Sequence, residues 1–131
     1  MKRKMFFLIV CSLLLISACT PAQPAETGFL EGSVTVGPLQ PVVSSDQTPA
    51  PPAAEVYTSR GVEVYKINGD HPIASQYFSS TGGYRFELPA GSYRLELMKT
   101  GIDTAKELPV EFEILAGQVT RLDLEIDTGI R

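Results

Sequence analysis

The sequence predicts an all-β protein, a β-sandwich of roughly 100 residues. From Phe29 onward, apolar residues recur at nearly every second position, which places alternate side chains on one face of a strand. No segment shows a clear helical period of 3.6 residues. Seven short alternating runs are separated by turn residues, and this spacing is typical of two packed sheets.

The N-terminal segment has the pattern of an export signal. Lys2, Arg3 and Lys4 precede residues 6–16, which are apolar apart from Cys11 and Ser12. The run is too short to cross a hydrocarbon core, which needs roughly 20 apolar residues in a helix. We therefore expect residues 1–18 to be a removable signal peptide rather than a permanent span.

Cys19 closes the run Ile16-Ser17-Ala18-Cys19, which resembles the lipobox of bacterial lipoproteins. The resemblance implies cleavage before Cys19, a diacylglycerol on its thiol and often an acylated amine. Two or three acyl chains hold a protein at a membrane, whereas one chain does so only marginally. The alternative is an ordinary secretory signal with an incidental cysteine. Since the only other cysteine is Cys11, the mature chain would have no thiol for a disulfide or metal site.

Residues 20–28, Thr-Pro-Ala-Gln-Pro-Ala-Glu-Thr-Gly, predict a flexible tether after the lipidated cysteine. Fully extended, this tether would hold a domain of residues 29–131 at most roughly 30 Å from the lipid surface. The alternative, a strand of the domain, is disfavoured by the prolines.

The first three strands are expected at residues 30–36, 61–67 and 73–79. In the first, Leu30, Val34 and Val36 alternate with polar residues. The second and third are joined across Asn68-Gly69-Asp70, whose Asn-Gly pair is a strong signal for a hairpin turn.

The clearest alternation lies on either side of Pro89-Ala90-Gly91. The sequence there predicts a hairpin with a buried aromatic and aliphatic face. The residues expected inside are Tyr84, Phe86, Leu88, Tyr93, Leu95 and Leu97.

The last two strands are expected at residues 110–114 and 122–126, around a turn at Ala116-Gly117-Gln118. Val119 has the opposite parity from Leu122, so a bulge or a late strand start is expected near Thr120.

A proline-rich insertion, residues 37–60, interrupts this rhythm with five prolines. A loop of this length without secondary structure is usually functional or disordered. We expect residues 49–52 to form an extended, polyproline-like surface piece. The candidate partner-binding residues are Tyr57, Pro49, Pro51 and Pro52; a strap over a sheet edge and a mobile insertion are the alternatives.

Two motifs resemble those of a known family. Gly83-Tyr84-Arg85-Phe86 followed by Leu88-Pro89-Ala90-Gly91-Ser92-Tyr93 is similar to the turn motifs of carboxypeptidase regulatory-like domains, and Gly32-Ser33-Val34 resembles their first strand. The resemblance covers residues 29–127 and implies a seven-stranded, immunoglobulin-like (prealbumin-like, transthyretin-like) sandwich. Its motifs are structural, so it informs the fold more than the function.

The charge balance excludes one class of partner. Removing the signal takes away three of the 11 basic residues and leaves eight against 15 acidic residues, a formal balance of −7. Such a chain has no electrostatic footprint for nucleic acid, and anionic headgroups should repel it. Membrane contact is therefore expected through the lipid, with the domain standing off the surface.

Few residues suit catalysis or metal binding. His71 is the only histidine, and its place beside a turn favours a solvated imidazole. No G-x-S-x-G nucleophile elbow occurs. Asp123, Glu125 and Asp127 alternate on one strand face, which suits a solvated acidic surface better than a weak calcium site. No enzyme, cofactor or metal is predicted.

The sequence thus predicts a non-catalytic, membrane-anchored lipoprotein of the cell membrane or outer membrane. It would serve as a binding or structural module of the cell envelope, with an envelope protein as its partner. The alternative function is a lipoprotein that binds a small ligand, a carbohydrate or calcium. The tail from Asp127 to Arg131 is expected either to dock a partner or to fold back on the sandwich.

Overall fold

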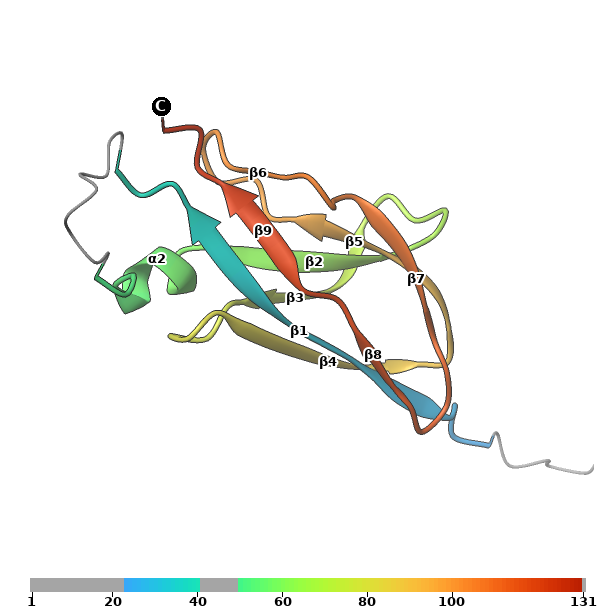
Figure 1. The fold of residues 1–131 in the computed structure, drawn as a ribbon. Helices are drawn as coiled ribbons and strands as arrows, with labels where there is room; N and C mark the ends of the chain where they lie inside the picture. Colours follow the sequence, from blue (N-terminus) through green and yellow to red (C-terminus); the bar gives the residue numbers. More distant parts are fainter. Residues whose placement is uncertain (1–22, 41–49, 131) are drawn as a thin grey trace, which may run out of the picture.

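The computed structural model describes residues 23–40 and 50–130, which form two facing β-sheets (Figure 1). The predicted immunoglobulin-like β-sandwich is confirmed. The signal segment and Cys19 lie outside the described residues. Within the described part, no helix is long and apolar enough to cross a membrane. The elements are β1 (Thr27–Gly37), α2 (Ala54–Thr58), β2 (Gly61–Lys66), β3 (Pro72–Tyr77), β4 (Gly83–Pro89), β5 (Gly91–Leu97), β6 (Thr104–Ala105), β7 (Val110–Ile114), β8 (Val119–Arg121) and β9 (Leu124–Asp127).

The first sheet is built around β1. Its strand order is β4-β1-β9-β6, and β8 also pairs with β1. β4 runs antiparallel to β1, whereas β8 and β9 run parallel to successive halves of it. The second sheet has the order β3-β2-β5-β7 and is antiparallel throughout. All seven predicted strands are present, and β6 and β8 are short additions.

The core lies between the sheets and contains the residues whose parity predicted burial. Leu30, Val62, Val64, Leu95 and Ile126 are fully inaccessible to solvent. Leu97 is only partly buried, although it packs against the core. Tyr84 and Tyr93 keep their hydroxyl groups satisfied, since they donate to the Leu122 and Pro89 carbonyls at 2.6 and 2.7 Å. Burial raises the pKa of both phenols.

The predicted hairpin around Pro89-Ala90-Gly91 is wrong, because β4 and β5 belong to different sheets. The chain crosses between sheets here: the Ala90 N–H donates to the Glu26 carbonyl at 2.8 Å, on the β1 side. Both strands bury the predicted face, so the alternation was right while the pairing was not. The β7–β8 turn likewise connects the two sheets.

The expected irregularity near Thr120 falls slightly later, at Leu122 and Asp123, where the chain passes from β8 to β9. This break brings the Leu122 carbonyl directly over Gly32 of β1. A Cβ atom added to Gly32 would lie 1.7 Å from that oxygen. Gly32 therefore allows the two backbones to approach, which gives a physical reason for the first-strand glycine.

The boundaries of two predicted segments also change. Thr27 and Gly28, expected in the tether, begin β1. The insertion, expected to lack secondary structure, contains the five-residue helix α2. A helix this short shows little more than one turn, so its apolar residues cannot establish a helical period.

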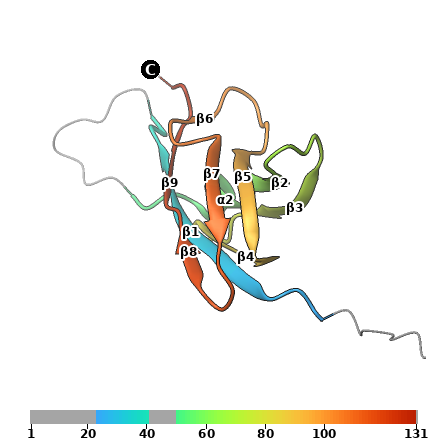
Figure 2. The same cartoon turned by 90° about the vertical axis from the view of Figure 1, so that its right-hand side faces the viewer.

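The molecule has two poles, which strand β1 connects (Figures 1 and 2). The N-terminal pole holds the start of β1, the β4–β5 crossover and the β7–β8 turn. The C-terminal pole holds the end of β1, α2, the β5–β6 loop and the C-terminal residues. With 11 residues at about 3.3 Å each, β1 separates the poles by roughly 35 Å.

Candidate partner-binding site

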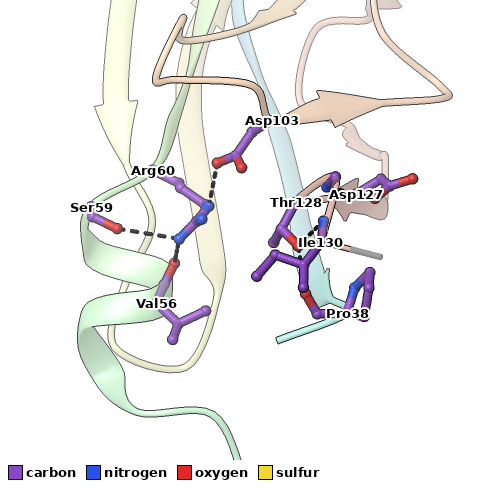
Figure 3. A network of polar contacts seen from close by, with 9 residues as sticks. Pro38, Val56, Ser59, Arg60, Asp103, Asp127, Thr128 and Ile130 are labelled. Atoms are coloured by element: carbon purple, nitrogen blue, oxygen red, sulfur yellow. Dashed lines mark hydrogen bonds and ion pairs between the residues drawn. The ribbon is translucent and has the colours of Figure 1, made fainter. Parts of the chain in front are cut away.

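The C-terminal tail is attached to the end of β1 at the C-terminal pole. The Thr128 N–H donates to the Gly37 carbonyl at 3.2 Å. Its buried hydroxyl donates a short hydrogen bond to the Pro38 carbonyl (Figure 3). The tail was expected either to dock a partner or to fold back on the sandwich. The structure shows that it folds back as far as Thr128. The start of the insertion is thereby fixed to the last strand.

The other end of the insertion is fixed by Arg60, which follows α2. Its Nε atom donates to the Asp103 carboxylate at 2.6 Å, and its Nη1 atom donates to the Val56 carbonyl at 2.7 Å (Figure 3). The Arg60 side chain is only 18% exposed, and the Asp103 side chain only 8%. This ion pair joins α2 to the β5–β6 loop in a setting partly shielded from water.

Tyr57 packs on the fold instead of projecting from it. It is half-buried against the core, and its ring lies beside Gly82. A Cβ atom on Gly82 would approach the Tyr57 ring to 3.0 Å, and Gly82 has a positive φ of 84°. Pro51 is exposed and Pro52 is half-buried, whereas Pro49 lies outside the described residues. Binding by these four residues stays a prediction, with Tyr57 better placed as a support.

The structure adds two exposed aliphatic side chains, Leu39 and Ile102, to Ile130 of the tail, which the sequence already indicated as a docking candidate. These three residues, here called the apolar rim, lie after β1, in the β5–β6 loop and after β9, the segments of the C-terminal pole. Ile102 is 74% exposed. A Cβ atom on Gly129 would lie 2.9 Å from its Cδ1 atom, so the β5–β6 loop and the tail are adjacent. Ile102 stands alone between turn residues, where no strand alternation could identify it.

The residues considered for chemistry remain apart. His71 is exposed on the β2–β3 turn. Asp123 accepts hydrogen bonds from Arg121 at 3.0 Å and from the Ser33 N–H at 2.8 Å, and these bonds lower the pKa of its carboxyl to about 2. Among the described residues, no group of three or more His, Cys, Asp or Glu side chains is arranged to hold a metal ion.

Shallow depressions flank β6, with volumes of about 210 and 480 Å³. The larger is bordered by Pro38, Lys106 and Asp127, and the smaller by Glu96 and Asp103. Asp103 is already paired with Arg60, and Asp127 accepts a hydrogen bond from the Gly129 N–H at 2.8 Å. These polar groups serve the fold, so neither depression presents a built ligand site.

The fold and the C-terminal pole define an immunoglobulin-like sandwich module. No family model matches the chain, and no curated protein matches its sequence. Similar solved structures include GBS52, the minor pilin of Streptococcus agalactiae, with a TM-score of 0.53 and 20% identity over 79% of this chain and 45% of that one. The Bacillus anthracis TIE protein gives a TM-score of 0.52 and 19% identity over 77% of this chain and 16% of that one.

A DUF3823 family protein from Parabacteroides merdae gives a TM-score of 0.48 and 20% identity, covering 79% of this chain and 47% of that one. The chain therefore spans less than half the length of each of these structures. At these identities the first two comparisons support the fold alone. The resemblance to carboxypeptidase regulatory-like domains is supported only as far as the sandwich, and the specific family stays a prediction.

Proposed function

We propose that this chain is a non-catalytic lipoprotein of the cell envelope, anchored through Cys19, that binds an envelope protein through its C-terminal pole. The proposal rests chiefly on the course of β1, which begins at the tether and ends at the insertion. If Cys19 is acylated, the end of β1, α2 and the C-terminal residues lie at the pole remote from the anchor. That pole is then free to meet a partner.

The surface at this pole suits contact with another protein. The described residues 38–40 and 50–54 carry no charge, in a mature chain whose balance is −7. Like-charge repulsion against an acidic partner would therefore be least there. The neighbouring apolar rim supplies exposed aliphatic area, and such patches commonly mark interaction sites.

The support for this surface is rigid, which lowers the entropic cost of binding. Arg60 and Asp103 hold α2, and Thr128 holds Pro38, so both ends of the insertion are fixed to the sandwich.

The test is photo-crosslinking of the full lipoprotein in its native membrane. A photoreactive phenylalanine analogue replaces Ile102, with the same analogue at the exposed Ile73, which lies beside the β4–β5 crossover, as the matched control. We expect a discrete protein adduct from position 102 and none from position 73. Replacing residues 41–49 with an equally long Gly/Ser segment should weaken the adduct at least several-fold. That replacement spares Val56 and Tyr57, which pack on the core.

Equal adducts from both positions, or an adduct indifferent to the 41–49 replacement, would place the contact elsewhere on the domain. The absence of any adduct from position 102 in intact membranes would also contradict the proposal. Far-ultraviolet circular dichroism of each variant verifies that the sandwich remains folded.

A further inference from the structure

The N-terminal pole exposes an uncharged, partly apolar surface. Residues 114–120, Ile-Leu-Ala-Gly-Gln-Val-Thr, contain no charged side chain, and neither do residues 88–93 of the β4–β5 crossover. Leu115 and Val119 are 46% and 53% exposed. Solvent-exposed aliphatic side chains therefore occur at both poles of the molecule.

Backbone hydrogen bonds attach these segments to the start of β1. The Gly117 N–H donates to the Thr27 carbonyl, and the Phe29 N–H donates to the Gln118 carbonyl, both at 2.8 Å. The Ala90 N–H donates to the Glu26 carbonyl at 2.8 Å. In Figures 1 and 2 the β7–β8 turn lies beside the point where the chain enters β1. An anchor at the N-terminal end of the chain would therefore also hold Leu115 and Val119 close to the membrane.

The chain length between Cys19 and Thr27 permits direct contact with a membrane. Eight residue steps extend to at most about 26 Å, and any coiling brings the pole nearer. Nothing in this length forces the domain away from the surface to which Cys19 would be attached.

The distribution of charge favours this pole over the rest of the surface. A mature chain with a balance of −7 is repelled by anionic headgroups, but repulsion acts mainly between charges within about a Debye length. Glu87 and Glu113 directly precede the two uncharged segments, and Arg94 and Arg121 directly follow them. Each segment is thus bordered by one acidic and one basic residue and carries no charge of its own, so repulsion by anionic headgroups is least where these segments face the membrane.

We propose that Leu115 and Val119 contact the lipid bilayer, so that the N-terminal pole rests on the membrane instead of standing off it. This inference rests on the proposed acylation of Cys19. The occupant of the apolar surface is the lipid headgroup and upper acyl region, where aliphatic side chains are stabilised by leaving water. The long axis of the sandwich is then directed away from the membrane, and the apolar rim is presented outward.

The test uses the acylated protein in vesicles of phosphatidylethanolamine and phosphatidylglycerol. A single cysteine is introduced by Leu115→Cys or Val119→Cys and labelled with an environment-sensitive fluorophore; in the mature chain the acylated Cys19 offers no free thiol. Ile102→Cys, also exposed but at the opposite pole, is the matched control. We expect a blue shift and quenching by headgroup spin-labelled lipids at positions 115 and 119, with at least fivefold less quenching at 102.

Each other outcome has a separate meaning. Failure of the protein to float with vesicles would refute the anchor itself. Flotation with an unquenched, water-like signal at 115 and 119 would refute bilayer contact while leaving the anchor intact. A blue shift without lipid quenching would assign the surface to a protein neighbour, and equal quenching at 102 would mean that the domain lies on its side; both overturn the inference.

Discussion

Replacing Gly32 with alanine is expected to lower the free energy of unfolding by roughly 3 kcal/mol or more. The new Cβ atom would lie 1.7 Å from the Leu122 carbonyl oxygen and 2.9 Å from the Tyr84 ring. Because the nearest obstacle is backbone, the chain between β8 and β9 must move to make room. That movement would also disturb the hydrogen bond from the Tyr84 hydroxyl to Leu122.

Urea unfolding followed by circular dichroism and tyrosine fluorescence measures this effect, since the chain has no tryptophan. Gly69→Ala is the matched control, because its new Cβ would meet nothing closer than 3.4 Å. A loss below about 1 kcal/mol for Gly32→Ala, or an equal loss for Gly69→Ala, would contradict the proposed close approach of β1 and Leu122.

Replacing Asp103 with alanine is expected to cost about 2 kcal/mol, because Arg60 would be left without its carboxylate partner in a partly buried setting. The same change should loosen α2, which Arg60 ties to the β5–β6 loop. Urea unfolding gives the energetic loss, and amide hydrogen exchange at residues 54–60 reports the local loosening.

The exposed pair of Arg121 and Asp123 provides the comparison. Its side chains are 61% and 53% exposed, so Arg121→Ala should destabilise the protein much less than Asp103→Ala. If Asp103→Ala were no more destabilising than Arg121→Ala, the Arg60–Asp103 pair would have no special role in holding the insertion.

The strand pattern was predictable because alternation follows directly from the pleat of a strand. Tyr84, Phe86, Tyr93 and Leu95 are buried as their parity indicated. The partner of each strand was not predictable in the same way, since an inward-facing residue looks the same in either sheet. For that reason the crossover at Pro89-Ala90-Gly91 was mistaken for a hairpin, whereas the β2–β3 hairpin was marked by its Asn-Gly turn.

The candidate site was predictable in place more than in detail. The prolines located the insertion, but they could not show that Tyr57 packs beside Gly82, which is 25 residues further along the chain. Ile102 emerges at the same pole because the β5–β6 loop lies next to the tail, a contact between distant segments. Single exposed aliphatic residues in loops are common, so Ile102 could be recognised as a candidate contact residue only from its neighbours in the folded structure.

The two poles give the proposals a common geometry. The N-terminal pole joins the predicted tether and exposes Leu115 and Val119, while the C-terminal pole presents the insertion and the apolar rim. The sandwich separates the two poles by roughly 35 Å along β1. Both proposals depend on one predicted modification, the acylation of Cys19.

The most direct test is the intact mass of the protein extracted from its native membranes. Anchorage through Cys19 predicts a mature chain that begins at Cys19 and carries a diacylglyceryl group, with or without a third acyl chain. It also predicts that Cys19→Ser abolishes this mass. A mature chain that begins at another residue, or one that begins at Cys19 without lipid, would contradict the anchor and with it the assigned orientation of the two poles.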